Sequence, residues 1–245
     1  MGIYDRDYMR ERARERVIDT GSGVTSFANQ VYSWMGIGLA LTGLVAYALF
    51  RTGLFMSLLP FWWVFGFGTL GIAFAIQGLL ERASFGTIAG LFLAYAGVEG
   101  LFFGVTLPLY AAAYGGQLIW MAFSTAAVVS GAAVCYGMFT KSDLTNVGRL
   151  FSFGVMCLLA MTVLYFLLSF FMTLTWLHLL ICYVGLVLFI GLTAYDAQQI
   201  RTMSYQADVN STASYKLSLV MALKMYINVI MIFWYLLQIF ARRND

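Results

Sequence analysis

The residues best suited to chemistry in this sequence are three ionisable side chains inside long apolar runs. Glu99 lies deep in one run, Asp196 near the end of another, and Lys224 inside the last. A charge at bilayer depth costs about 2.5–3.5 kcal/mol on insertion scales, so such residues are usually retained for a function. Intramembrane carboxyl groups in particular mark ion pathways and proton relays. These side chains therefore indicate where function should be sought.

Two consecutive apolar runs are expected to bring Asp196 close to Lys224 and Asn228. At a rise of 1.5 Å per residue, Asp196 lies about 6 Å from the end of the sixth run. Lys224 and Asn228 lie about 10 Å and about 16 Å along the seventh run by the same rise. They share one helix face because they are four residues apart. Since intramembrane charges usually pair, the sequence predicts a buried pair between Asp196 and Lys224.

Glu99 forms a second candidate site. It lies about 21 Å along the third run at helical rise, among Gly97, Gly100 and Gly104. Small residues allow helix backbones to approach closely in membranes, so Glu99 should face a neighbouring helix rather than lipid. Two interpretations are open: a hydrogen-bonded glutamic acid that holds helices together, and a relay for protons or cations.

The composition indicates the elements that must position these residues. The chain is 62% hydrophobic and 10% charged, whereas soluble domains are about 45–50% apolar and about 25% charged. A membrane-spanning helix needs about 20 apolar residues. The sequence thus predicts an all-α integral membrane protein, a bundle of seven transmembrane helices. The runs are approximately Gln30–Phe50, Pro60–Leu80, Phe85–Leu107, Leu118–Phe139, Leu150–Phe171, Leu177–Ile200 and Leu217–Phe240.

The charged residues predict the organisation and orientation of the chain. Residues 1–27 form a charged arm, 28–241 the transmembrane domain and 242–245 a short tail. The arm has Arg and Asp or Glu at four-residue spacing, which favours an amphipathic helix. Its five arginines, and the Lys and Arg residues after the second, fourth and sixth runs, place the N-terminus in the cytoplasm. Arg242 and Arg243 oppose this alternation, but the last run is long enough for a full crossing rather than a re-entrant helix.

Several classes of function are disfavoured. His178 is the only histidine, so a histidine-rich zinc site is excluded, and an interfacial role for His178 is favoured over metal binding. No nucleophile, base and orienting group occur together, so an enzyme is not expected. The basic residues form no stripe for nucleic acid. Only Pro108 hints at the broken helix that metabolite transporters often contain. The expected partner is membrane lipid, with no cofactor.

Four segments carry a resemblance to a known family. Together they indicate that the chain, from about Phe27 onward, resembles the Bax inhibitor-1 (TMBIM) family in its bacterial YccA/YetJ-like branch. The segment with the Tyr-Asp-x-Gln pattern is the most specific of the four. The segments are Gly191–Ile200, Ala222–Phe233, Asn29–Met35 and Tyr136–Leu144.

The resemblance implies a fold and two kinds of function. The fold is a seven-helix bundle with the last helix at its centre, in a bacterial inner membrane. Some members are linked to a pH-dependent calcium leak, in which aspartates on the sixth and seventh helices pair with each other or with an arginine to open and close a pore. Asp196 matches the first aspartate and Arg82 the arginine. The family also allows a non-conducting protein that modulates other membrane proteins or a membrane quality-control protease.

The position of the second aspartate is occupied by Asn228, which changes the expected chemistry. Asp196 cannot share a proton with a second carboxyl group there. We expect it to stay ionised near neutral pH and to pair with Lys224 or Arg82. Calcium prefers several oxygen ligands with net negative charge, and a neighbouring ammonium group opposes its binding. The sequence therefore favours a cation or proton pathway in which calcium binding is weakened.

Overall fold

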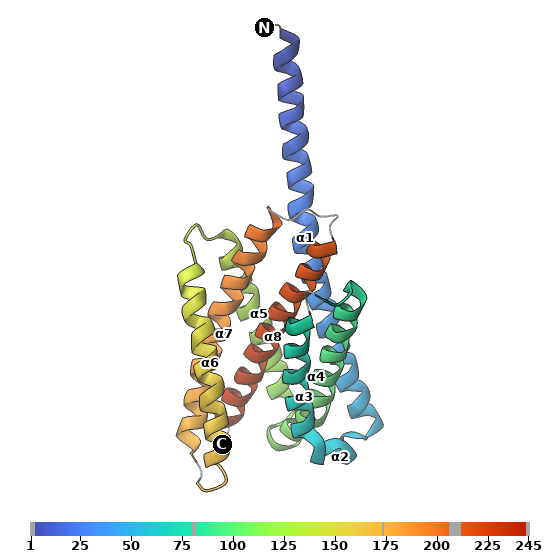
Figure 1. Ribbon diagram of the computed structural model, residues 1–245. Coiled ribbons are helices and arrows are strands. Elements are labelled where there is room, and N and C mark those ends of the chain that lie inside the picture. Colours follow the sequence, from blue (N-terminus) through green and yellow to red (C-terminus); the bar gives the residue numbers. More distant parts are fainter. Residues whose placement is uncertain (1–2, 80–81, 173, 206–211, 244–245) are drawn as a thin grey trace.

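The computed structural model describes residues 3–79, 82–172, 174–205 and 212–243, and these residues form helices and short connections only (Figure 1). Seven stretches of helix in this part of the chain are long and apolar enough to cross a membrane. The prediction of an all-α, seven-transmembrane bundle is confirmed. The helices are α1 (Ile3–Thr52), α2 (Phe55–Leu58), the 3₁₀ helix η1 (Leu59–Phe61), α3 (Trp62–Leu79), α4 (Phe85–Tyr114), α5 (Gly116–Phe139), α6 (Thr145–Leu168), α7 (Thr175–Ser204) and α8 (Thr212–Arg243).

Most helices extend beyond the apolar runs from which they were predicted, but α6 ends at Leu168, three residues before the predicted end at Phe171. A spanning segment must satisfy its backbone polar groups internally, so the helix does not stop where the side chains become polar. The second span comprises α2, η1 and α3, and Pro60 lies in the first turn of η1, where its missing N–H is tolerated. Pro108 lies inside α4, which continues to Tyr114. The broken helix suggested by Pro108 is therefore absent from α4.

The charged arm and the first span share one helix. α1 begins at Ile3 and runs to Thr52, and its membrane span is Phe27–Thr52. The side chains of α1 up to residue 26 lie outside the described part of the chain. The amphipathic character of the arm and the ion pairs expected along it therefore stay predictions.

α8 lies at the centre of the bundle and packs against α1, α4, α5 and α7 (Figure 1). In an 18-residue apolar stretch of its span, 56% of the residues are buried. The corresponding share for α6, which faces outward, is 6%. The expectation of a central last helix is confirmed. α8 is also unbroken from Thr212 to Arg243, which supports a full crossing rather than a re-entrant helix and extends the helix into the expected tail.

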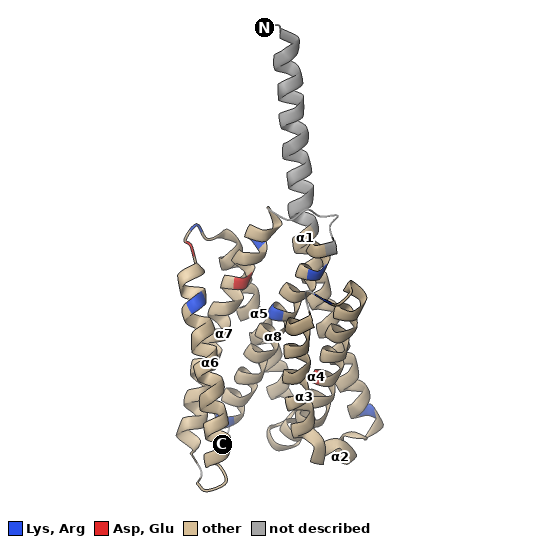
Figure 2. Ribbon diagram, in the orientation of Figure 1, with Lys and Arg blue, Asp and Glu red and all other residues tan. Residues whose placement is uncertain are grey.

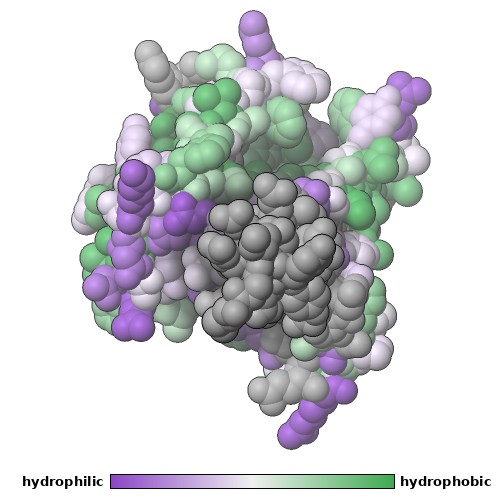
Figure 3. Space-filling model, turned by 90° about the horizontal axis from the view of Figure 1, so that it is seen from above, coloured by the Kyte–Doolittle hydropathy of each residue, from purple (hydrophilic) through white to green (hydrophobic). Residues whose placement is uncertain are grey.

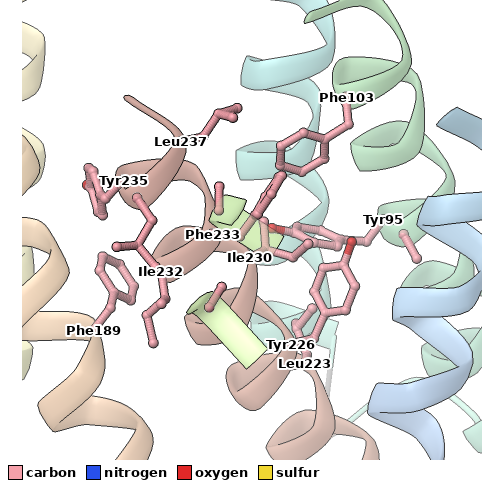
Figure 4. Close-up of a cluster of buried hydrophobic side chains, with 14 of the residues drawn as sticks. Tyr95, Phe103, Phe189, Leu223, Tyr226, Ile230, Ile232, Phe233, Tyr235 and Leu237 are labelled. Atoms are coloured by element: carbon pink, nitrogen blue, oxygen red, sulfur yellow. The ribbon is translucent and has the colours of Figure 1, made fainter. Parts of the chain in front are cut away.

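The surface of the bundle suits a lipid environment. Many large apolar side chains are exposed, including Leu44, Phe74, Trp120 and Phe171. Charged residues are sparse along the spans (Figure 2), and the view onto the end where α1 joins the bundle shows hydrophilic residues among hydrophobic ones (Figure 3). The core lies on both sides of α8, with Tyr226 beside Tyr95 of α4 on one side and Tyr235 beside Phe189 of α7 on the other (Figure 4).

Two glycines allow the close helix contacts that position the candidate residues. A Cβ on Gly137 of α5 would collide with the carbonyl oxygen of Ala194 on α7, two residues before Asp196. A Cβ on Gly100 of α4 would lie 2.7 Å from Cβ of Val45 on α1. Close backbone approach of this kind is how membrane helices associate without a hydrophobic driving force. The packing therefore fixes α7 at Asp196 and α4 at Glu99.

Candidate functional site in the membrane core

Asp196 and Asn228 meet between α7 and α8. Nδ2 of Asn228 donates a hydrogen bond of 2.7 Å to Oδ2 of Asp196. The two residues are 5% and 4% exposed, so the contact is shielded from solvent. The short distance lies in the range of charge-assisted bonds to a carboxylate. Asp196 retains a second oxygen and further lone pairs with which it can accept a proton, water or a cation.

Lys224 is near this contact but is not the direct partner of Asp196. Its charge acts on the Asp196 carboxyl group, yet the two form no ion pair within the described part of the chain. The side chain of Lys224 is exposed, whereas Asn228, one turn further along α8, is buried against α7. The hydrogen-bonded partner of Asp196 is thus Asn228, and the pairing of Asp196 with Lys224 stays a prediction. The physical reason is that a long lysine side chain can carry its ammonium group toward water, while the short amide stays in the helix contact.

Arg82 is also not brought to Asp196. It lies in the turn between α3 and α4, its backbone N–H donates to the carbonyl of Leu79, and its side chain is exposed. Within the described residues it forms no ion pair with Asp196. The expected alternative pairing with Arg82 is therefore not present either, because the neutral Asn228 occupies the position next to the carboxylate.

The end of α7 that carries Asp196 is fixed to the connection between α5 and α6. Oε1 of Gln198 accepts from the backbone N–H of Leu144 at 2.8 Å, and its Nε2 donates to the carbonyl of Ser142 at 2.7 Å. Arg201 donates to the carbonyls of Met138 and Thr140 at the end of α5. Sequence analysis did not predict these roles. The sequence feature that could have indicated these roles is the presence of two motif segments, Tyr136–Leu144 and Gly191–Ile200, which are in contact in the fold.

The connection that Gln198 holds also contains an ordered acidic turn. Oδ1 of Asp143 accepts from the backbone N–H of Thr145 at 2.9 Å, just where α6 begins. The hydrogen bonds from the side chain and backbone of Thr145 hold the pKa of Asp143 below its ordinary value. The carboxylate is fully exposed. Asp143 is thus a solvent-accessible acidic residue on the same side of the bundle as Asp196.

Glu99 lies in a separate polar cluster on the other side of α8. It is 8% exposed, and the hydroxyl of Thr69 on α3 is its hydrogen-bonding partner. Tyr95 and Tyr226 lie close enough for its charge to act on them. The Tyr226 hydroxyl lies 2.6 Å from the hydroxyl of Thr42 on α1. The cluster therefore joins α1, α3, α4 and α8, which is the arrangement expected of a carboxyl group that holds helices together.

The chemistry available at Asp196 is the binding of protons or cations. Among the described residues, no group of three or more His, Cys, Asp or Glu side chains could hold a metal ion. A single carboxylate next to an amide and a nearby ammonium group suits a proton or a monovalent ion better than a divalent one. The site places one titratable group at the contact between the two last spans.

Comparison with known proteins agrees with this architecture. The family described as "Inhibitor of apoptosis-promoting Bax1" matches residues 24–245. A protein of Chlamydia muridarum is 46% identical over 98% of this chain and 98% of its own length. The inner membrane protein YbhL of Escherichia coli K12 is 32% identical over 94% of this chain and 97% of its own length. A protein of Deinococcus radiodurans is 33% identical over 90% of this chain and 92% of its own length. This seven-helix chain belongs to the Bax inhibitor-1 family of membrane proteins.

Proposed function

We propose that this protein forms a leak pathway for protons or monovalent cations, gated where Asp196 of α7 meets Asn228 of α8. The buried hydrogen bond of 2.7 Å between these residues is the observation that carries the proposal. It links the central helix to its neighbour through a group that can gain or lose a proton. Protonation of the carboxylate removes the charge that strengthens this bond, so the contact between α7 and α8 is weaker when the carboxylate is neutral.

The surrounding contacts support a gate at this point. α7 is held to the α5–α6 connection through Gln198 and Arg201, so it provides a fixed side. Gln199, three residues after Asp196, has a buried Oε1 without a protein hydrogen-bond partner. A buried acceptor of this kind is usually satisfied by water or an ion. This acceptor supports a path for such species one helical turn from Asp196.

Ion selectivity follows from the charges at the gate. Calcium sites use several anionic oxygens, whereas this gate has one carboxylate, one neutral amide and the nearby charge of Lys224. The positive charge of Lys224 disfavours a divalent ion more than a monovalent one, because the repulsion scales with ionic charge. We therefore assign protons and monovalent cations to this pathway, in place of the calcium that the family resemblance implies.

The position of the protein in the cell follows from two further observations. The Escherichia coli relative is described as an inner membrane protein, and we propose the same bacterial inner membrane for this chain. The five arginines of the N-terminal arm favour a cytoplasmic N-terminus. The gate then lies nearer the cytoplasmic face, and lipid is the constant partner of the protein. No cofactor and no enzymatic step is required.

A flux assay tests the proposal directly. The purified full chain is reconstituted in liposomes, and the flux of protons, potassium and calcium is measured at acidic and neutral pH. We expect a wild-type flux of protons or potassium that changes with pH. Asp196→Asn should make the flux independent of pH, because the amide cannot titrate. Asp143→Asn is the matched control, since it removes an exposed carboxylate on the same side and should leave the response unchanged.

Two results would contradict the leak pathway. One is a wild-type protein that passes none of the three ions at either pH, which would favour the alternative of a non-conducting modulator of membrane proteins or of a membrane protease. The other is an Asp196→Asn protein that keeps the wild-type pH response. Truncation of residues 1–20 is a second test that distinguishes a leak pathway from a modulator. A leak through the bundle survives the cut, whereas a modulator that docks through the arm loses its effect.

A further inference from the structure

A second polar site lies at the opposite end of the bundle from Asp196. His178 is eighteen residues before Asp196 on α7, which corresponds to about 27 Å of helix. A cavity of about 290 Å³ is present at that end, between the end of α4, the start of α7 and the end of α8. Its polar lining residues are Tyr110, Tyr114, His178, Gln238 and Arg242.

The cavity is lined by hydrogen-bond donors around one positive charge. Arg242 lines the cavity with Tyr110 and His178, and its charge acts on both of them and on Cys182. No Asp or Glu is among the described residues that line the cavity, and Arg242 forms no ion pair within the described part of the chain. A guanidinium group offers five N–H donors in a planar fork that matches phosphate oxygens.

The donors are held in place by neighbouring contacts. Gln238 is 8% exposed, its side chain is a hydrogen-bonding partner of His178, and its Nε2 donates to the carbonyl of Trp234 at 3.3 Å. The His178 ring packs on Tyr165 with centroids 5.3 Å apart. A site whose polar groups are fixed before a ligand arrives loses less entropy when the ligand binds.

The position of the cavity suits a ligand from the membrane surface. It lies at the ends of three spans, and the Tyr110 ring lies 6.1 Å from that of Tyr114 and 6.0 Å from that of Trp234. Tyrosine and tryptophan gather at the level of lipid headgroups. Basic pockets between membrane helices bind lipid headgroups at the cytoplasmic face of other membrane proteins, and the same chemistry applies at this face.

We propose that this cavity binds a phosphate group, carried by the headgroup of an anionic phospholipid or supplied as free inorganic phosphate. Arg242 binds the phosphate oxygens through its fork, and the Tyr110 hydroxyl donates a further hydrogen bond. The site is separate from the Asp196–Asn228 contact, because Arg242 lies fourteen residues, or about 21 Å of helix, beyond Asn228 on α8. It ties α4, α7 and α8 together at this membrane face.

Native mass spectrometry of the full chain released from nanodiscs tests the site. The nanodiscs contain phosphatidylcholine with or without phosphatidylglycerol, and inorganic phosphate is titrated separately. We expect retention of phosphatidylglycerol over phosphatidylcholine, reduced about tenfold by Arg242→Gln through loss of a charge-assisted bidentate contact. Tyr110→Phe keeps the ring, removes one donor and should give a smaller reduction. Arg51→Gln is the control, because Arg51 is an exposed arginine at the end of α1 on the same membrane face.

The outcomes separate the two sources of phosphate and can overturn the proposal. Release of bound phosphatidylglycerol by inorganic phosphate identifies free phosphate as a ligand of the same site, while retention at high phosphate identifies the headgroup. Equal loss of lipid in Arg242→Gln and Arg51→Gln would overturn the proposal, because it would show general charge attraction. If Arg242→Gln does not fold, unchanged lipid binding by a folded Tyr110→Phe protein would overturn it as well.

Discussion

The contact between Asp196 and Asn228 can be measured with a double-mutant cycle. The variants are Asp196→Ala, Asn228→Ala and the double substitution. Asn228→Ala removes the amide that donates to the Asp196 carboxylate, which is 5% exposed, and leaves that carboxylate buried. The double variant removes both partners, so its loss of stability should be clearly smaller than the sum of the two single losses.

The structure gives the expected size of the coupling. Hydrogen bonds to charged groups contribute about 1.5–3 kcal/mol, and a bond of 2.7 Å between two buried side chains belongs in that range. Lys224 does not replace the lost donor, because its exposed side chain makes no direct contact with Asp196 in the described structure. We therefore expect a coupling free energy of about 1.5–3 kcal/mol.

The assay is reversible unfolding of the four proteins in detergent micelles, followed by circular dichroism at neutral pH. Asp143→Ala, Thr145→Ala and the double substitution provide a matched control cycle, since the side-chain hydrogen bond between these residues is exposed to solvent and should show a clearly smaller coupling. Single losses for Asp196 and Asn228 that add to the double loss within about 0.5 kcal/mol would refute the reasoning. The buried bond would then contribute nothing, and a gate built on it would be untenable.

Three further outcomes are expected. Gly137→Ala should destabilise the bundle by about 1–3 kcal/mol, as overpacking does, whereas Gly131→Ala on the same helix has nothing within 4 Å of its new Cβ and should leave the unfolding midpoint unchanged. Glu99→Gln should keep both stability and ion flux, because an amide can still bond within the cluster; a stable variant with reduced flux would instead identify Glu99 as a relay. The pKa of Asp143 is lowered in the folded protein. The bond of Asp143 to Thr145 therefore contributes its full stabilisation of the start of α6 at pH values above the ordinary aspartate pKa of 3.8. This stabilisation is lost as the pH falls through the lower pKa of the folded state. The protection of the Thr145 amide proton against exchange, relative to an unstructured chain at the same pH, should fall only in that acidic range, and a fall at neutral pH would contradict this assignment.

The local features of the site illustrate how far a sequence can be interpreted. Asp196 and Asn228 were both singled out, and the four-residue spacing of Lys224 and Asn228 correctly placed them on one face of a helix. The choice between them as partner of Asp196 could not be made from spacing. It depends on the rotation and tilt of α8 against α7, and on the close approach of α5 to α7 at Gly137.

The contacts of Gln198 and Arg201 show the same limit. Both residues lie in a motif that could be recognised, yet their partners are backbone groups of residues 138–144, more than fifty positions earlier in the chain. Such partners become visible only when α5, α6 and α7 are assembled. The cavity at Arg242 likewise draws on three helices that are distant in sequence.

The amino-acid sequence by itself determined that this chain crosses a membrane in seven helices. Length and apolarity suffice for that conclusion, because runs of about 20 apolar residues match the length of a membrane-spanning helix, which satisfies its backbone polar groups within itself. Tertiary structure alone decided which helix faces meet, since spans that are apolar on every side carry no strong amphipathic signal to orient them. It therefore decided that a neutral asparagine, and not a lysine or an arginine, is the direct partner of the buried aspartate.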